Sequence, residues 1–325
     1  MSQPLVTERK GQTIYSQHNR GSQREILQRR VRTTIPLNEG VMDSAMISLK
    51  TNWKHRYRYI RFRFVDFCCL GYMAFIALAL PFFHREVADW PVDFLVHVCL
   101  VVAALEFIRL GETHPQNKVL WTIRTFYPVA FYSYGWIELD HMVRMFLGSY
   151  WATDFLVKAD KVIFGVHPTL WAKQLFTPWL DELMSIFYSV YYFFMPLVTL
   201  PLYFQGKREE TIAAFSIVTF TYFMNFLLFY SLPALGPKMI PWIEELHTAE
   251  YTGYLVSSFN RFVQANGSVM GGAFPSSHVS GALVWSLTAW RYNRRFGYLL
   301  LPMVLGVAIS TVYLGYHHAV DPTSG

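Results

Sequence analysis

The chain has 325 residues, of which 53% are hydrophobic, 18% are aromatic and only 15% are charged. An average soluble domain carries roughly 25% charged residues, so this composition argues against a soluble globular protein. The formal net charge is +6, but the basic residues stand at the ends of apolar segments and in the N-terminal region. This distribution argues against a nucleic-acid partner and indicates membrane topology instead.

The N-terminal region is polar and has no hydrophobic period. Residues 1–52 also lack the short apolar core of a cleaved signal peptide, and they predict a disordered tail. Residues 54–63 then place dense positive charge directly before the first apolar segment. Such a flank lies in the cytoplasm under the positive-inside rule, so we expect a cytoplasmic N-terminus followed by N-terminal transmembrane helices over residues 53–140.

Seven apolar segments predict membrane-spanning helices, and hence an all-α, polytopic helical membrane protein. The segments are 64–83, 94–108, 120–136, 183–204, 211–232, 279–290 and 298–316. Threading them from a cytoplasmic N-terminus places every short basic loop on the inner side. The long connection 139–182 falls outside, where its mixed aromatic and charged residues predict helices at the membrane interface.

The same threading brings three polar regions to the outer face. The first reads Phe-Pro-Ser-Ser-His-Val-Ser-Gly over residues 274–281, with His278 at the start of the sixth apolar segment. Serine hydroxyls and free backbone N–H groups at a helix N-terminus form a site for an anion such as phosphate. Ser276 or Ser277 is equally suited to be an ordinary helix N-cap, which is the more common role of serine at this position.

The second region, residues 310–321, ends the seventh segment. His317 and Asp321 are four residues apart, so on a helical turn the carboxylate holds the imidazole Nδ1–H and leaves Nε2 free as a nucleophile. On a soluble helix this would be an ordinary surface pair, but ionisable residues at membrane depth are usually functional. His318 points away from His317 on such a turn and is not expected in the core of the site.

The third region, Leu-Pro-Ala-Leu-Gly-Pro-Lys at residues 232–238, follows the fifth segment. Lys238 supplies positive charge for phosphate oxygens, and the proline and glycine residues favour a turn that brings the backbone close to a ligand. A lysine at the end of a membrane span also commonly extends to the lipid head groups without any further role.

Together the three regions resemble the type 2 phosphatidic acid phosphatase superfamily, which shares its fold with the vanadium haloperoxidases. Residues 275–278 match its Pro-Ser-x-His motif in full. Ser310, His317 and Asp321 match its Ser-Arg-x5-His-x3-Asp motif, except that Thr311 stands where the common pattern has arginine. This difference leaves less positive charge around the phosphate.

The upstream sequence is similar to one branch of this superfamily, the inositol phosphorylceramide synthase-like group. The similar features are Asp160-Lys-Val-Ile-Phe-Gly165, Pro168, Trp171, Pro178-Trp-Leu-Asp-Glu182, the tyrosine-rich stretch 188–192 and the Gly-Pro-Lys turn, in which Lys238 stands for the branch's arginine. The resemblance implies a lipid phosphatase- or phosphotransferase-like catalytic domain over residues 141–325 in the helical bundle, with the active site at the outer membrane face. Because the superfamily continues into a further helix after its third motif, we expect this domain to lack its last helix.

The resemblance also implies the roles of individual residues. His317 attacks phosphorus to form a phosphohistidine, Asp321 orients its imidazole, and His278 protonates the leaving oxygen. The substrate-binding residues are Lys238, Ser276, Ser277 and Ser310. No metal or other cofactor is required, and the expected partners are a lipid phosphate and the bilayer, with the active site periplasmic, extracellular or, in a eukaryote, luminal.

Other functions stay open at this point. His278, His317 and Asp321 also make a possible zinc set, because two histidines and one carboxylate are known catalytic ligands, and sensitivity to a chelator separates this metal-dependent hydrolase from the phosphohistidine enzyme. A lipid-binding or transport protein without chemistry is a third reading, although no paired discontinuous helices of the transporter kind are visible. A haloperoxidase-like role is disfavoured by the missing arginine and by the membrane setting. The lipid substrate, the choice between hydrolysis and transfer, and the oligomeric state are not encoded in any pattern that we recognise.

Overall fold

A computed structural model of the chain describes residues 60–246 and 253–323. The expected disordered tail 1–52 lies outside the described residues, as does most of the basic run 54–63. The α-helices are α3 (Phe64–Ala79), α4 (Trp90–Thr113), α5 (Lys118–Met142), α6 (Thr153–Phe164), α7 (Pro168–Lys173), α8 (Pro178–Phe204), α9 (Arg208–Ser231), α10 (Pro241–Leu246), α11 (Leu255–Gly267), α12 (Ser277–Tyr292) and α13 (Arg294–Tyr313). Two short 3-10 helices, η1 (Pro237–Met239) and η2 (Asp321–Thr323), complete the described part, which contains no β-strand.

Each of the seven predicted apolar segments forms a helix, in chain order α3, α4, α5, α8, α9, α12 and α13. Polar residues set several of the boundaries. The side chain of Asn117 accepts hydrogen bonds from two backbone N–H groups at the start of α5. The side chain of Asn293 accepts one, from Phe296, at the start of α13. These caps satisfy N–H groups that have no partner inside the helix.

Four of these helices, namely α4, α8, α9 and α13, are long and apolar enough to cross a membrane, as judged over the described residues. The prediction of an all-α membrane protein is therefore confirmed. Helices α3 and α12 each have 16 residues and reach only about 24 Å, less than the roughly 30 Å of a hydrocarbon core. Helix α5 is long enough, but it carries Arg124 and Glu138, and these charges lower its apolar character.

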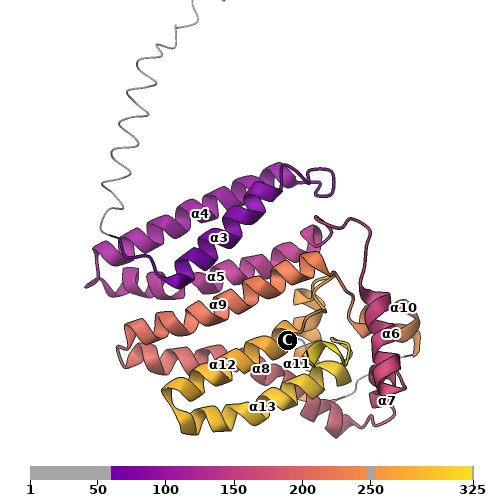
Figure 1. The fold of residues 1–325 in the computed structure, drawn as a ribbon. Coiled ribbons are helices and arrows are strands. Elements are labelled where there is room, and N and C mark those ends of the chain that lie inside the picture. Colours follow the sequence, from indigo (N-terminus) through magenta and orange to yellow (C-terminus); the bar gives the residue numbers. More distant parts are fainter. Residues whose placement is uncertain (1–59, 247–252, 324–325) are drawn as a thin grey trace, which may run out of the picture. The chain divides into compact units, whose positions relative to one another are not determined.

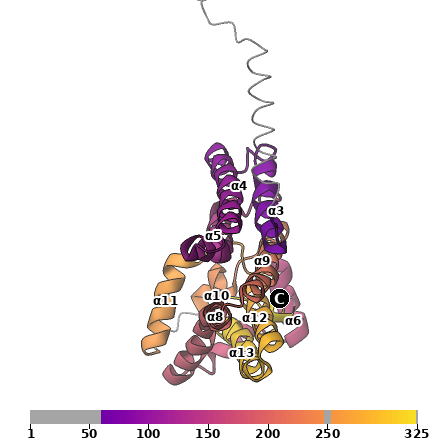
Figure 2. The ribbon, with the colours of Figure 1, turned by 90° about the vertical axis from the view of Figure 1, so that its left-hand side faces the viewer.

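Helix α9 lies at the centre of the helical arrangement. It packs against α3 and α5 on one side and against α8 and α12 on the other, and α12 in turn packs closely on α13 (Figure 1, Figure 2). The buried side of α9 is rich in phenylalanine, with Phe215, Phe223, Phe226 and Phe229 at most 4% exposed. Helix α9 thus joins the N-terminal helices to α8 and to α12, which carries His278.

The N-terminal helices are also held together by buried charges. Arg124 on α5 and Asp66 on α3 are fully buried and form an ion pair of 2.7 Å, and Tyr127 donates a further hydrogen bond of 2.7 Å to the same carboxylate. A second buried pair joins His97 on α4 to Glu138 on α5, with 2.9 Å between the atoms. Because a charge in an apolar interior is costly without a partner, these pairs strongly favour one packing of α3, α4 and α5.

The basic loops gather at one end of the helices. Arg63, just before α3, forms ion pairs with Glu112 at the end of α4 and with Glu209 at the start of α9. Arg208 donates a hydrogen bond of 3.0 Å to the backbone of Pro115, in the loop between α4 and α5. Charged loops that are distant in the sequence therefore meet at the end opposite the predicted site (Figure 1).

The connection 139–182 contains the predicted short helices, α6 and α7. Helix α6 is amphipathic: it buries Leu156 and Asp160, while Phe155, Val162 and Ile163 are more than 60% exposed. This exposed apolar face is typical of a helix that lies along a membrane surface.

Candidate functional site

The three polar regions predicted to form the site meet at one end of the helices. The backbone N–H of Ala234 donates to the carbonyl of Gly271, and that of Ala273 donates to the carbonyl of Ala234, each over 3.2 Å. The third region therefore runs beside the segment that leads directly into the first region. The backbone N–H of Lys238 donates to Gly315 over 2.9 Å, which joins the third region to the second. Short backbone contacts thus bring together segments that are distant in the sequence, as Lys238 and Gly315 are.

The first region ends in the N-terminus of α12. Ser276 is the N-cap of this helix: its Oγ accepts a hydrogen bond of 3.4 Å from the N–H of Val279. Its side chain is fully buried and does not line the cavity described below. Ser277 and His278 do line this cavity, so only these two residues of the motif face it.

The second region does not continue α13 as predicted. The helix ends at Tyr313, and Gly315 adopts a left-handed conformation with φ of 74°, which glycine accepts without steric cost. His317 therefore lies in the loop after the helix, where its N–H donates to the carbonyl of Thr311 over 3.1 Å. The prediction of His317 and Asp321 on one helical turn is wrong, because the chain reverses at Gly315.

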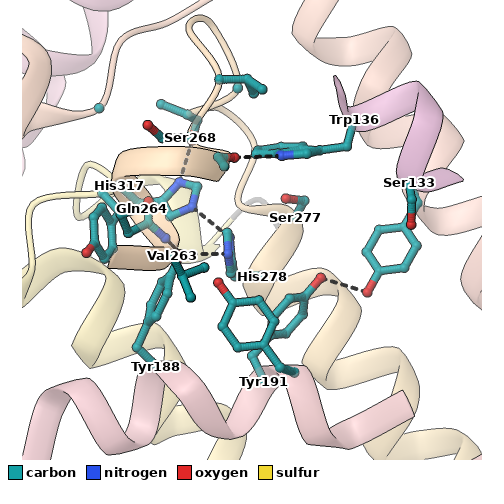
Figure 3. A pocket seen from close by; sticks show the side chains of 18 of the residues that line it. Ser133, Trp136, Tyr188, Tyr191, Val263, Gln264, Ser268, Ser277, His278 and His317 are labelled. Carbon is teal, nitrogen blue, oxygen red and sulfur yellow. Dashed lines mark hydrogen bonds between the residues drawn. The ribbon is translucent and has the colours of Figure 1, made fainter. Parts of the chain in front are cut away.

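The contacts of His317 decide which of its nitrogens carries the proton. Nδ1 lies 2.6 Å from the carbonyl oxygen of Ala273 and 3.5 Å from Oδ2 of Asp321. A carbonyl oxygen accepts and never donates, so the proton is on Nδ1. Nε2 then has its lone pair free, and it points toward Nδ1 of His278 over 3.4 Å (Figure 3).

Asp321 lies behind His317 and outside the cavity. It is fully buried, and its Oδ2 accepts a hydrogen bond of 2.7 Å from the N–H of His318. Burial raises the pKa of the Asp321 carboxyl, and the neighbouring His317 and His318 only partly oppose this shift. The carboxylate therefore gains stability when a positive charge develops on the imidazole of His317.

His278 is held between His317 and a chain of polar side chains. Its Nε2 lies 2.8 Å from the hydroxyl of Tyr188 on α8, and this hydroxyl accepts a hydrogen bond of 2.6 Å from the amide of Gln264 on α11 (Figure 3). Tyr188 belongs to the tyrosine-rich stretch noted in the sequence, but no sequence pattern pointed to Gln264.

Lys238 provides the positive charge of the site. Its Nζ stands 3.8 Å from the ring centroid of Tyr316, a cation–π contact. Burial lowers the pKa of Lys238 to about 8. Gly236 precedes this residue in a position without space for a side chain, because a Cβ there would collide with the backbone oxygen of Tyr316.

His318 and Asp160 fix the loop at the end of the second region, which carries His317 and Asp321. Asp160 on α6 accepts hydrogen bonds from the N–H groups of Ala319 and Val320, over 3.1 and 3.0 Å. His318 places Nε2 3.0 Å from the carbonyl of Leu235 and Nδ1 3.5 Å from Asp160. Burial lowers the pKa of His318, but Asp160 and the charge of Asp321 raise it more, so the net shift is upward.

A cavity of about 440 Å³ lies in front of the two site histidines and Lys238. Its polar lining includes His278, His317, Lys238, Ser277, Tyr188 and Gln264. The remaining wall is largely apolar or aromatic and comes from α5, α8, α9, α11, α12 and the adjoining loops. Trp136 and Ser133 lie on the side across from the histidines (Figure 3). Ser310 does not reach the cavity, because it is fully buried and its Oγ donates to the carbonyl of Val307 within α13.

The geometry of His278, His317 and Asp321 also bears on the possible zinc set. Within the described ranges, no three His, Cys, Asp or Glu side chains are grouped so as to hold a metal ion. His278 and His317 are adjacent, whereas the closest approach of Asp321 to His317 is on the Nδ1 side, away from His278. The three residues therefore form a row in this structure.

The fold and the site together define a helical membrane protein in which two histidines and one lysine share a cavity with a largely apolar and aromatic wall. The sequence profile of the PAP2 superfamily matches residues 155–325, more than half of the chain, and the chain therefore belongs to this superfamily. The match begins in α6 and includes every residue predicted for the site. Membership indicates a phosphatase- or phosphotransferase-type function. No curated protein and no solved structure matches the chain.

Proposed function

We propose that the protein is a membrane lipid phosphatase or head-group phosphotransferase that acts through a phosphohistidine on His317. One observation carries this proposal: Nδ1 of His317 is occupied by the carbonyl of Ala273, at 2.6 Å, while Nε2 faces His278. A nucleophile with a free lone pair thus stands beside a second titratable group, the arrangement that covalent catalysis requires.

In the first half-reaction, Nε2 of His317 attacks phosphorus and the bond from phosphorus to the lipid oxygen breaks. The negative charge of the bound phosphate favours the imidazolium form of His278. His278 gives its Nδ1 proton to the leaving oxygen and becomes neutral, with its remaining proton on Nε2. The phosphorylated ring of His317 carries a positive charge, which the carbonyl of Ala273 and the carboxylate of Asp321 stabilise from the Nδ1 side.

The second half-reaction reverses these roles. Neutral His278 takes a proton from water, or from the hydroxyl of an acceptor, and the resulting oxygen nucleophile attacks phosphorus. The bond between phosphorus and Nε2 breaks, and His317 returns to its neutral form. Water as the nucleophile gives a phosphatase, whereas an acceptor hydroxyl gives a transferase, so access of water to the cavity decides between them.

The negative charge of the transferring group needs fixed positive partners. Lys238 is the only lysine or arginine among the described residues that line the cavity. Ser277 and the free backbone N–H groups at the start of α12 add hydrogen-bond donors. With Thr311 in place of the superfamily's usual arginine, Lys238 carries a larger share of phosphate binding than one cation among several would.

The wall of the cavity favours a lipid phosphate over a soluble one, because most of it is apolar or aromatic and the protein is a membrane protein. The basic loops lie at the far end of the helices, and the positive-inside rule places that end in the cytoplasm. The site would then act at the outer face of the membrane. The similarity to the inositol phosphorylceramide synthase-like branch makes sphingolipid and inositol phospholipid substrates the first to test.

The test is release of phosphate or head group from a panel of phospholipids, sphingolipids and polyprenyl phosphates by the purified full chain in detergent. Wild type, His317→Ala and the control His141→Ala are compared with and without a chelator; His141 is a half-exposed histidine outside the cavity. We expect chelator-resistant activity in wild type and control, none in His317→Ala, and an acid-labile, alkali-stable phosphoenzyme in rapid-quench experiments. Full activity of His317→Ala refutes the proposal, and activity lost on chelation supports a metal enzyme instead.

A further inference from the structure

The imidazole of His278 is held at both of its nitrogens. Nδ1 faces Nε2 of His317 over 3.4 Å, and Nε2 faces the hydroxyl of Tyr188 over 2.8 Å. Tyr188 is only 1% exposed, so water does not compete freely for this hydroxyl. The rings of Tyr188 and Tyr191 also lie against the imidazole, with centroid distances of 5.0 and 4.7 Å.

The hydroxyl of Tyr188 keeps Nε2 of His278 occupied in both protonation states that the mechanism uses. The oxygen of Tyr188 accepts from the amide of Gln264 over 2.6 Å and has a second lone pair for Nε2–H of His278. When His278 is an imidazolium, its Nδ1–H points toward Nε2 of His317 (Figure 3). After Nδ1 has given up this proton, Nε2–H still donates to Tyr188, so the lone pair of Nδ1 is ready to take a proton back. Tyr188 therefore serves both protonation states without any movement of the ring.

Gln264 reaches this position because α11 is anchored at both ends. At its start, the carboxylate of Glu182 accepts three hydrogen bonds, of 2.7, 2.7 and 3.1 Å, from the backbone N–H groups of Tyr254, Val256 and Ser257. At its end, the indole of Trp136 donates to the carbonyl of Gly267 over 3.0 Å. The helix is thus fixed on α8 and α5, and it holds Gln264 above Tyr188.

We propose that Tyr188 and Gln264 are positioning residues for His278, an inference that rests on the proposed phosphohistidine function. They keep Nε2 occupied, so that the proton is exchanged with the leaving and attacking oxygens at Nδ1 alone. Without them the imidazole turns about its side-chain torsion and Nδ1 loses its direction. The cost falls on proton transfer, while the attack by His317 is unaffected.

If Tyr188 and Gln264 affect only proton transfer, the effect of replacing them should depend on the leaving group. An alkoxide is a poor leaving group and requires a proton from His278, whereas a nitrophenolate leaves without one. General acid catalysis contributes about 10²- to 10⁴-fold to a rate. When Nδ1 of His278 is no longer held in place, the release of an alcohol should therefore slow strongly, and the release of nitrophenolate should slow little.

The experiment compares decyl phosphate with 4-nitrophenyl phosphate as probes of the full chain in detergent, and measures the first turnover, before water enters the reaction. In Tyr188→Phe and Gln264→Leu we expect the rate of decanol release to fall about 10-fold or more, with KM changed less than about 2-fold, and nitrophenolate release to stay within about 3-fold of wild type. His278→Ala should show the same pattern with a larger difference.

Two matched controls test for general damage. Tyr203→Phe removes a tyrosine hydroxyl from the same helix α8, where it contacts Thr122 outside the cavity, and Asn266→Ala removes an exposed amide from α11. Both should keep the wild-type ratio of the two rates. Gln264→Leu leaves α8 intact and tests the contact even where Tyr188→Phe folds poorly.

Equal loss on both probes, or no loss on either, in Tyr188→Phe and Gln264→Leu overturns the positioning role. Failure of the underlying function has a different signature: His317→Ala then still releases nitrophenolate, whatever the other variants do. A lack of leaving-group dependence in His278→Ala overturns the proposal as well, because the residue being positioned would not be the acid.

Discussion

The charge of Lys238 should set the alkaline limit of activity. Burial lowers the pKa of this side chain to about 8, so in the free protein its charge is largely present at pH 7 and mostly lost at pH 9. With a pKa of about 8, the charged fraction falls from about 90% to about 10% between these values, and kcat/KM should fall roughly tenfold. Arginine keeps its charge throughout this range.

The assay is the pH profile of kcat/KM between pH 6 and pH 10 for wild type and Lys238→Arg, on the best substrate of the lipid panel. We expect a descending limb near pH 8 in wild type and its displacement upward by at least one pH unit in the arginine variant. Lys238→Met should lower kcat/KM most at pH 7 and little at pH 9. An identical descending limb in wild type and Lys238→Arg would refute the reasoning.

Unfolding of the protein does not explain the expected fall in kcat/KM above pH 8, because deprotonation of Lys238 changes stability in the opposite direction. The folded protein releases the Lys238 proton near pH 8, whereas the unfolded chain keeps it up to the ordinary pKa of 10.5. Between these values the unfolded state binds more protons, so the contribution of this group to stability rises with pH. Activity should fall in a range where Lys238 itself makes the fold more stable.

Three further predictions concern the framework of the site. Gly236→Ala should shift the Lys238 turn away from the backbone of Tyr316 and lower the free energy of unfolding by about 1–3 kcal/mol, measured in detergent; unchanged stability and activity would contradict the close contact. Arg124→Leu should lower the free energy of unfolding by about 3–5 kcal/mol because it leaves the buried Asp66 carboxylate without its ion-pair partner. The double variant with Asp66→Leu should recover part of this stability, and no recovery would argue against the pair. Asp160→Ala should lower the free energy of unfolding by about 1–3 kcal/mol, because two backbone N–H groups lose their acceptor. It should also lower kcat, because these bonds hold the loop that carries His317. A kcat equal to that of wild type would show that the loop keeps its position without Asp160.

The site shows how two neighbouring histidines obtain different surroundings. His317 turns Nδ1 toward a carbonyl and a carboxylate, both acceptors, which favour a proton on that nitrogen. His278 turns Nε2 toward a hydroxyl, which accepts or donates. A ring fixed by an acceptor suits a nucleophile, and a ring beside a hydroxyl suits a group that gains and loses a proton in each turnover. These different contacts support the two roles that we propose.

The sequence by itself determined the kind of protein and the location of its chemistry. Apolar segments of helical length predict an all-α membrane fold, because in the bilayer the backbone N–H and C=O groups must form their hydrogen bonds within the segment itself. The spacing of His278, His317 and Asp321 was sufficient to indicate the superfamily, since these residues stand in short local motifs. The short basic loops follow every second apolar segment, which also indicated that positive charge gathers at one end of the helices.

Only the tertiary structure decided which side chains meet. Gln264 contacts Tyr188 across 76 positions, and Asp160 reaches the His317 loop across about 160; no local pattern encodes such pairs, because packing of distant helices creates them. Ser276 and Ser310 match the motifs, yet backbone groups within their own segments occupy their hydroxyls. His317 and Asp321 were predicted on one helical turn, but the chain turns at Gly315 and both lie beyond the helix. Ala273 and Asp160 hold this loop, and they can do so only because distant segments pack beside it.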